Sequence, residues 1–150
     1  RDAKTSAPKK PKAASPRKPA APVQPAERAR KLAMTIAEVA LDNKALNVEI
    51  IDVRGKVDYS DYVVVMSGRS DRQVNALGRN IEDELAHKHG ARCLGVEGMP
   101  QGTWLLMDYG DVIVHIFHED TRGYYDLETL WMDASRVAVD DDAGAKPPRR

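Results

Sequence analysis

A short run near the middle of the chain constrains the fold more than any other feature. Residues 62–67 (YVVVMS) form an apolar run without an interruption. Successive side chains of a strand point to opposite faces of its sheet, so such a run is typical of a strand that is buried on both faces. We expect a second central strand over residues 47–54, which are short and rich in β-branched side chains.

Helices are predicted before and after these two strands. From Glu27 to about Lys44, apolar residues recur at three- and four-residue spacing, as they do on one face of a helix. A second helix should occupy about residues 71–89, because Ser70 and Gln73 have the spacing of a capping box and a glycine follows at position 90. Its predicted apolar face comprises Val74, Leu77, Ile81 and Leu85.

The last third of the chain contains the clearest hairpin. Residues 103–108 and 112–117 are two strand-like runs that a tight turn at residues 109–111 joins. Residues 92–96 predict a further strand, and residues 121–135 predict a final helix. The predicted order is αββαβββα, which indicates an α/β or α+β domain in which helices flank a mixed sheet.

The chain divides into a basic arm, an acidic body and a short tail. Residues 1–31 carry ten Lys and Arg against two acidic residues, whereas residues 32–136 carry ten against eighteen. The net charge of zero therefore hides two segments of opposite sign. The predicted boundaries are residues 1–26 for the arm, residues 27–136 for the one folded domain that this length allows, and residues 137–150 for a flexible tail.

The arm is rich in Pro, Ala and Lys and has almost no apolar groups to bury, so we expect it to be disordered. Two interpretations are open, a nonspecific contact with RNA phosphates and a solvated extension without a partner. A mitochondrial presequence is disfavoured, because the dense prolines oppose an amphipathic helix. An arm that contacts RNA should steepen the salt dependence of binding, which deletion of residues 1–26 tests.

The sequence also restricts the cellular setting. Cys93 is the only cysteine, which rules out an intrachain disulfide and a multi-cysteine zinc site. No apolar run approaches the roughly 18 residues that span a bilayer, and no secretory signal is visible. We therefore expect a soluble intracellular protein without membrane contact. Because the chain begins at Arg1, an upstream targeting segment cannot be judged.

Signatures of catalysis are mostly missing. The sequence contains no Gly-x-Ser-x-Gly elbow, no Gly-x-Gly-x-x-Gly loop and no His-Glu-x-x-His motif. Asp108 and Asp111 could hold a divalent cation, but a strand end and a turn explain them better. His115 and His118 point to opposite faces of a strand, so they cannot easily share an ion, and His115 is interpreted as a structural or interface residue. We expect no catalytic residue, no cofactor and no metal.

Aromatic side chains are concentrated in one segment. Six of the eight lie within 28 positions, between Trp104 and Trp131. Trp and Tyr are enriched at binding hot spots, because they cover much area with few rotatable bonds. About half of these rings should be core, with Phe117 and one of Tyr124 and Tyr125 first among them. The segment from Trp104 to Trp131 is therefore predicted to dock on a protein partner.

Short blocks spread over residues 28–133 carry a family resemblance. They are ALDNKA at 40–45, DYVVV at 61–65, SGxSxxQV at 67–74, EG at 97–98, WxLxDYGDVxVHxF at 104–117 and RxYYxLExLW at 122–131. Together, and in this order, they resemble the ribosomal silencing factor (RsfS, Iojap-like) family. The resemblance implies a nucleotidyltransferase-like topology, although the Gly-Ser plus Asp-x-Asp pattern of active nucleotidyltransferases is not evident.

The resemblance further implies a protein that binds large-subunit ribosomal protein fourteen where the two ribosomal subunits meet. By occupying that space it blocks joining of the small subunit and represses translation, typically when nutrients are short. Trp104 is the first choice for an anchor. Carried onto this sequence, the partner-binding residues of the hairpin and the last helix are Trp104, Leu106, Asp108, Tyr109, Tyr125, Leu130 and Trp131.

Alternatives stay open beside this hypothesis. A nucleotide-binding module or a nucleotidyltransferase-type enzyme would use Asp108 and Asp111. A homodimer could form through an exposed sheet edge or through the aromatic surface, and it would have to separate before docking if it hid Trp104. The bacterial cytoplasm is the expected location, and an organellar homologue is the alternative, because organelles have similar ribosomes.

Overall fold

The fold is that of a computed structural model, which describes residues 25–139. The predicted arm, up to residue 24, and the predicted tail, from residue 140, lie outside the described residues. In chain order the elements are α1 (Pro25–Asp42), β1 (Leu46–Asp52), β2 (Tyr62–Gly68), α2 (Asp71–His89), β3 (Gly95–Glu97), β4 (Trp104–Asp108), β5 (Val112–His118), α3 (Glu119–Tyr125), α4 (Leu127–Leu130) and β6 (Arg136–Val137).

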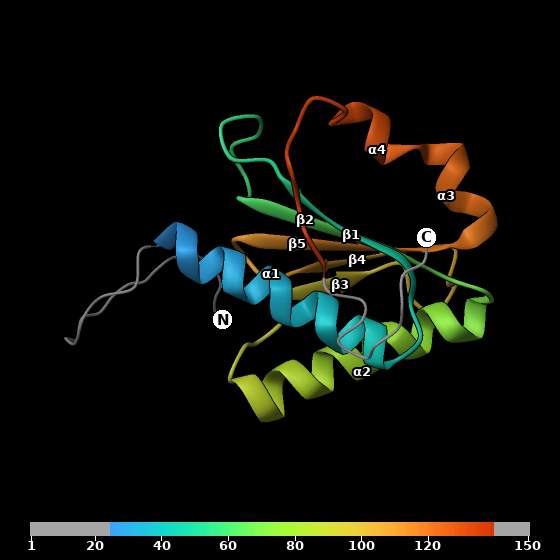
Figure 1. The fold of residues 1–150 in the computed structure, drawn as a ribbon. Helices are drawn as coiled ribbons and strands as arrows, with labels where there is room; N and C mark the ends of the chain where they lie inside the picture. Colours follow the sequence, from blue (N-terminus) through green and yellow to red (C-terminus); the bar gives the residue numbers. More distant parts are fainter. Residues whose placement is uncertain (1–24, 140–150) are drawn as a thin grey trace.

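The described strands form one six-stranded mixed sheet with helices on both faces (Figure 1). The strand order is β3-β4-β5-β2-β1-β6. β2 and β5 pair in parallel, whereas the other neighbouring pairs are antiparallel. This arrangement confirms the predicted fold class. It also places the apolar run of β2 in the interior of the sheet, where all seven residues of the strand are buried.

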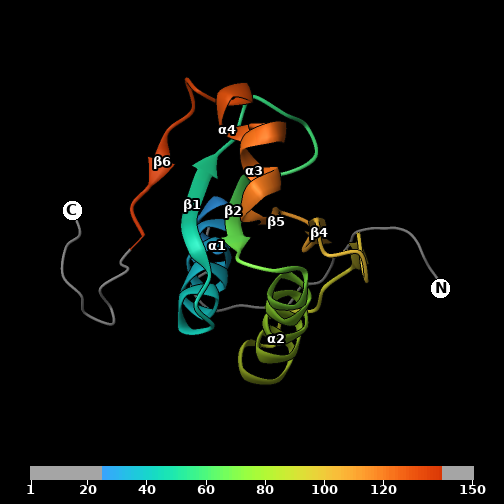
Figure 2. The same cartoon turned by 90° about the vertical axis from the view of Figure 1, so that its right-hand side faces the viewer.

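α1 and α2 lie along the same face of the sheet (Figures 1 and 2). The predicted apolar face of α2 is buried there, and α1 contributes a stripe of small and branched side chains to the same core. The predicted cap is also confirmed, because the Gln73 N–H donates to Ser70 Oγ at 3.1 Å. The Gln73 side chain reaches one residue further back than a capping box requires, and it accepts from the Arg69 N–H at 2.6 Å.

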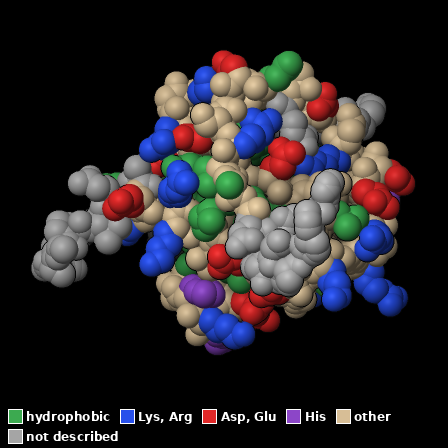
Figure 3. All heavy atoms as spheres, in the orientation of Figure 1, with side chains coloured by type: hydrophobic (Ala, Val, Ile, Leu, Met, Phe, Trp, Pro, Cys, Tyr) green, Lys and Arg blue, Asp and Glu red, His purple; other side chains and the backbone are tan. Residues whose placement is uncertain are grey.

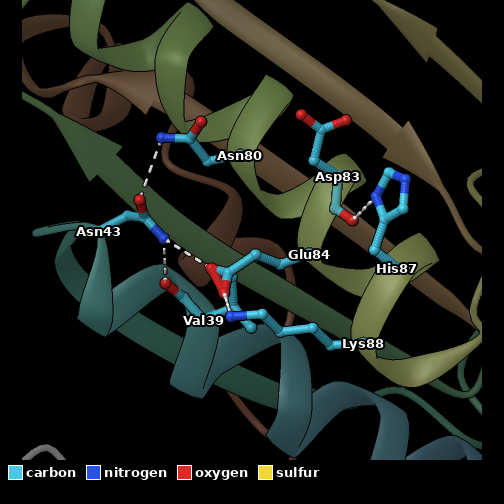
Figure 4. Close-up of polar contacts among 7 residues, drawn as sticks. All are labelled: Val39, Asn43, Asn80, Asp83, Glu84, His87 and Lys88. Atoms are coloured by element: carbon cyan, nitrogen blue, oxygen red, sulfur yellow. Dashed lines mark hydrogen bonds and ion pairs between the residues drawn. The ribbon is translucent and has the colours of Figure 1, made fainter.

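A polar clamp joins the end of α1 to the middle of α2 (Figure 4). Asn43 Nδ2 donates to the Val39 carbonyl at 2.8 Å and to Glu84 Oε1 at 3.3 Å. On the other side of the same amide, Asn43 Oδ1 accepts from Asn80 Nδ2 at 3.0 Å. Lys88 donates to Glu84 at 3.2 Å, and this hydrogen bond lowers the pKa of the Glu84 carboxyl. One side-chain amide thus ends α1 and fixes it against α2.

The opposite face of the sheet is only partly covered. α3 and α4 lie over β5, β2 and β1, while β4 and β3 extend beyond them (Figure 2). A second, smaller core fills the space under these helices and the segment that follows them. Its buried members are Ile51, Val53, Val63, Val65, Phe117, Trp131 and Ala134.

The prediction of one continuous last helix over residues 121–135 is wrong. The chain forms two short helices, α3 and α4, and Asp126 between them has the left-handed backbone conformation (φ 49°). The break redirects the chain so that Trp131 turns into the second core. After α4 the chain returns to the sheet as β6, which the sequence pattern did not predict, and Val137 pairs there with Ile50.

Two smaller differences concern strand boundaries. The third predicted strand, over residues 92–96, is displaced and shorter, since β3 covers Gly95–Glu97. Its pairing with β4 nevertheless begins one residue earlier, because the Leu94 N–H donates to the Asp108 carbonyl at 2.7 Å. Val137 is buried and paired with β1, so packed chain continues beyond residue 136, where the sequence analysis placed the end of the domain.

A candidate docking face on the sheet

Three residues of β4 point to the partly covered face of the sheet. Leu105 and Met107 are buried in the core under α1 and α2, and the alternation along a strand turns Trp104, Leu106 and Asp108 the other way. All three are half-buried. With Ile113 and His115, which lie opposite Asp108 and Leu106 on β5, they form the surface that we call the docking face.

Trp104 occupies the end of this surface, at the border with the second core. Its ring lies on the fully buried ring of Phe117, with 5.1 Å between the centroids and 28° between the planes. Its indole Nε1–H donates to His115 Nδ1 at 3.0 Å. One side of the ring is therefore packed, and the half-buried side chain keeps accessible surface for a partner.

His115 lies beneath this surface and has 7% of its area exposed. Burial lowers its pKa to about 4, because the charged imidazolium would lose its hydration. At neutral pH the ring is therefore uncharged, and Nδ1 can accept the proton of Trp104. The hydrogen bond and the burial agree with the interpretation of His115 as a structural or interface residue, and the lowered pKa favours the neutral ring at neutral pH.

The docking face is flanked by carboxylates. Glu97 of β3 is exposed and pairs with Leu106 across the strands. Asp108 lies two residues after Leu106 on β4 and therefore points to the same face. Asp108 Oδ1 accepts from the Gly110 N–H at 2.8 Å, which fixes the turn, and the Asp108 side chain is half-buried. The surface is thus apolar at Trp104 and Leu106 and acidic beside them.

Two of the predicted partner-binding aromatics are core residues in the isolated chain. Tyr109 belongs to the core under α1 and α2 with 7% of its area exposed, and Trp131 belongs to the second core with 5% exposed. Neither offers a partner more than an edge of its ring. The sequence pattern did not distinguish them from Trp104, because aromatic character favours burial and binding alike.

The last helix contributes one exposed apolar residue among those predicted. Leu130, at the end of α4, has 67% of its area exposed. Tyr125 ends α3, but its side chain lies outside the described residues, as does that of Tyr124. The expectation that one of these two tyrosines is core therefore stays a prediction, whereas the burial of Phe117 is confirmed.

Asp108 and Asp111, for which the sequence favoured a strand end and a turn over a cation site, both contribute to the backbone structure around the hairpin. Asp108 serves the turn, and the backbone carbonyl of Asp111 accepts from the Asp61 N–H at 2.9 Å. His118 lies at the start of α3, where its Nδ1 accepts from the Asp120 N–H at 3.1 Å. Within residues 25–139, no group of three or more His, Cys, Asp and Glu side chains is placed to hold a metal ion.

Cys93 is not arranged as a nucleophile. The thiol is partly buried and donates to the Gly95 carbonyl at 3.2 Å. Burial raises the pKa of the thiol, so the reactive thiolate is disfavoured at neutral pH. The neighbouring Leu94 is exposed.

Arg122 is a residue whose role the sequence did not reveal. It lies on α3 and is buried, and its Nη1 donates to the Asn47 carbonyl at 2.6 Å and to Ser67 Oγ at 3.0 Å. These bonds tie the helix beside the docking face to β1 and β2. Its presence in the RxYYxLExLW block was the one available signal, and that block does not distinguish a structural arginine from a binding one.

Charges of both signs are interspersed over the face of the molecule that Figure 3 shows. Two shallow pockets of the described part lie away from the docking face, one near the start of α1 and the other beside Asp52 and Arg54. The hydrogen bond from Arg54 lowers the pKa of Asp52, so the second is lined by a pair that is already satisfied. No helix of the described part is long and apolar enough to cross a bilayer.

Comparisons with known proteins agree on one family. The family model described as ribosomal silencing factor during starvation matches residues 26–150. A ribosomal silencing factor of Bacillus subtilis is 40% identical over 112 residues, which cover 74% of this chain and 94% of that protein. A chloroplastic Iojap protein of Arabidopsis thaliana is 27% identical over 115 residues, or 77% of this chain and 48% of that protein.

Solved structures are similar over the same region. A crystal structure from Chromobacterium violaceum superposes with a TM-score of 0.63 and 31% identity, covering 79% of this chain and 89% of its own. A second, from Bacillus halodurans, gives a TM-score of 0.62 and 34% identity, covering 73% of this chain and 99% of its own. The overall fold is therefore shared with these related structures.

Proposed function

The chain belongs to the ribosomal silencing factor family, and on this premise we propose that it represses translation by docking on the large ribosomal subunit. Its direct partner is large-subunit ribosomal protein fourteen, at the surface where the two subunits meet. A protein bound there occupies space that the small subunit needs, so subunit joining is blocked, typically under nutrient limitation. The function is one of binding and requires no catalytic step.

The observation that carries the proposal is the position of Trp104. Its ring is packed on Phe117 from one side, is half-buried, and belongs to β4, which extends beyond the part of the sheet that α3 and α4 cover (Figure 2). A flat ring held in this way loses little freedom when a partner covers it. Truncation of such an anchor commonly costs on the order of 2 kcal/mol or more, which is roughly a thirtyfold loss of affinity.

Charge favours the same kind of partner. Glu97 and Asp108 flank the apolar part of the docking face. Complementary potentials speed association and select against partners of the same sign. The docking face therefore suits a surface with an apolar centre and basic neighbours, as expected of a protein that is embedded among ribosomal RNA phosphates.

The other predicted contacts surround this anchor. Leu106 extends the apolar area beside Trp104, and Leu130 provides an exposed side chain at the end of α4. Tyr125 remains a candidate on α3. Tyr109 and Trp131 act from within the two cores, where they support the hairpin and the α4 segment.

Two binding experiments test the proposal. Purified ribosomal protein fourteen and purified large subunits are offered to the full chain in a pull-down, and subunit joining is then measured with the chain added before the small subunit. We expect both binding and slower joining. A chain that binds neither target, or that binds without affecting joining, contradicts the proposal. A parallel assay with nucleotide and Mg²⁺ tests the enzymatic alternative at Asp108 and Asp111, for which we expect no saturable binding.

Three further expectations belong with this function. The basic arm adds nonspecific contact with ribosomal RNA, or else it has no partner. A homodimer through the docking face competes with the ribosome, and so it dissociates when large subunits are added. The place of action is the bacterial cytoplasm, as the bacterial relatives suggest.

A further inference from the structure

We propose that His115 is a positioning residue of the docking face, whose Nδ1 atom holds the indole of Trp104 in the orientation that meets the partner. The inference rests on the proposed function, because the orientation of the ring matters only when a partner covers it. It goes further, because it assigns part of the contribution that Trp104 makes to partner binding to a side chain that the partner scarcely contacts.

Two neighbours restrain the indole in different ways. The stacking contact with Phe117, at 5.1 Å and 28°, limits the tilt of the ring plane. Stacking alone does not decide which edge of the ring points inward, because the second side-chain torsion of a tryptophan is broad and roughly two-fold. The hydrogen bond from Nε1–H to His115 Nδ1, at 3.0 Å, favours one of these orientations.

His115 is itself well held. It pairs with Leu106 across the strands, and its ring lies 6.1 Å from that of Phe117 on the same strand, with the planes 10° apart. Nδ1 accepts a hydrogen bond only while it carries no proton, so the ring must be neutral with its proton on Nε2. Burial keeps the ring uncharged, and the hydrogen bond from Trp104 selects the tautomer with the proton on Nε2. The side chain therefore acts as a fixed acceptor.

The small exposed area of His115 separates positioning from direct contact. With 7% of its surface accessible, it offers a partner almost nothing to bind. Trp104, beside it, is half-buried and lies on the surface. An effect of His115 on binding is therefore indirect, and the ring of Trp104, to which it is hydrogen-bonded, is the exposed group through which we expect it to act.

A matched pair of substitutions tests this role. His115→Asn keeps an acceptor oxygen in the place of Nδ1, whereas His115→Leu has nearly the same shape as Asn and puts a methyl group there. We expect His115→Leu to weaken binding to large subunits roughly tenfold, the effect of one buried hydrogen bond, and His115→Asn to stay within about twofold of the unchanged chain.

The orientation of the ring is read independently of the ribosome. In a ¹⁵N-labelled full chain, the indole N–H signal that disappears in Trp104→Phe belongs to Trp104. That proton should exchange slowly with solvent in the unchanged chain and in His115→Asn, and faster in His115→Leu. The Nδ1 signal of His115 should have the chemical shift of an unprotonated imidazole nitrogen at pH 7.

The outcomes separate this inference from the proposed function. An unchanged chain that does not bind large subunits contradicts the proposed function, while the indole and imidazole signals still report on the positioning. Binding by the unchanged chain together with equal affinities of the Leu and Asn variants overturns the inference and leaves the function standing. A protonated Nδ1 in the unchanged chain overturns it without any variant, so the test survives a His115→Leu chain that fails to fold.

Discussion

The guanidinium of Arg122 donates to the backbone carbonyl of Asn47 at 2.6 Å, across 75 positions of the chain. Asn47 is where β1 departs from regular pairing with β2, and its backbone has a positive φ of 50°. The same guanidinium nitrogen donates to Ser67 Oγ at 3.0 Å. A single buried side chain thus satisfies an irregular strand and holds α3 against the sheet, next to the docking face.

Arg122→Met should lower the free energy of unfolding by about 2–4 kcal/mol, because it keeps the apolar stem and leaves the Asn47 carbonyl and the Ser67 hydroxyl unpaired. Chemical denaturation measures this change. Ser67→Ala removes one of the two acceptors and should cost about 1 kcal/mol. Arg79→Met, on the exposed side of α2, is the matched control and should change stability by less than about 0.5 kcal/mol. Equal values for the two Arg variants would refute the role assigned to Arg122.

Gly98 makes the start of β4 possible. Its φ is +103°, and a Cβ atom there would overlap the carbonyl oxygen of Trp104. Gly98→Ala should therefore destabilise the domain by about 2–3 kcal/mol and displace Trp104 from the docking face.

Gly95, three residues earlier on β3, is the control for this substitution. A Cβ atom at Gly95 meets nothing within 4 Å, so Gly95→Ala should change the free energy of unfolding by no more than about 0.5 kcal/mol. Thermal unfolding and the emission spectrum of the tryptophans measure both effects. If Gly98→Ala is as stable as Gly95→Ala, the backbone contact with Trp104 is not a constraint on the fold.

The buried His115 predicts a pH dependence of stability. Its folded pKa of about 4 lies below the unfolded value of about 6.5, so the unfolded chain binds the extra proton between these limits. Above about pH 6.5 the ring is neutral in both states, and the free energy of unfolding does not depend on its titration. As the pH falls from 6.5 toward 4, the free energy of unfolding decreases by up to about 3 kcal/mol.

The difference between the unchanged chain and His115→Leu isolates this effect, because Asp52, Asp61 and Glu84, whose pKa values are also shifted, are common to both. Urea unfolding at several values of pH should therefore show that the unchanged chain loses stability relative to His115→Leu as the pH is lowered from 6.5 to 4. Parallel curves would show that His115 is as easily protonated in the folded state as in the unfolded one.

Local patterns in the sequence predicted much of the fold. The run of β2 is buried on both faces as expected, and the hairpin of β4 and β5 follows from two strand-like runs around a glycine turn. The cap at Ser70 and the end of α2 at Gly90, with φ 65°, also depend on neighbouring residues alone. Such features are set by contacts within a few positions, which a single sequence displays.

The failures all depend on distant contacts. The helical period of residues 121–135 does not reveal that Asp126 breaks the helix so that Trp131 can fill the second core. The two residues of β6 become a strand only by pairing with Ile50 and Ile51 of β1. In the same way, aromatic content identified the docking segment, but only the packing separates the buried Tyr109 from the half-buried Trp104.

The most direct test of the central claim compares two aromatic truncations. Trp104 lies on the docking face, whereas Tyr59 lies in the loop between β1 and β2, near the other end of the sheet, with 61% of its area exposed. The dissociation constant of the full chain for large ribosomal subunits is measured for Trp104→Ala and Tyr59→Ala, with circular dichroism to verify that both are folded. Trp104→Ala should weaken binding roughly thirtyfold and Tyr59→Ala less than twofold. A folded Trp104→Ala chain that binds as tightly as Tyr59→Ala would contradict the assignment of this face to the ribosome.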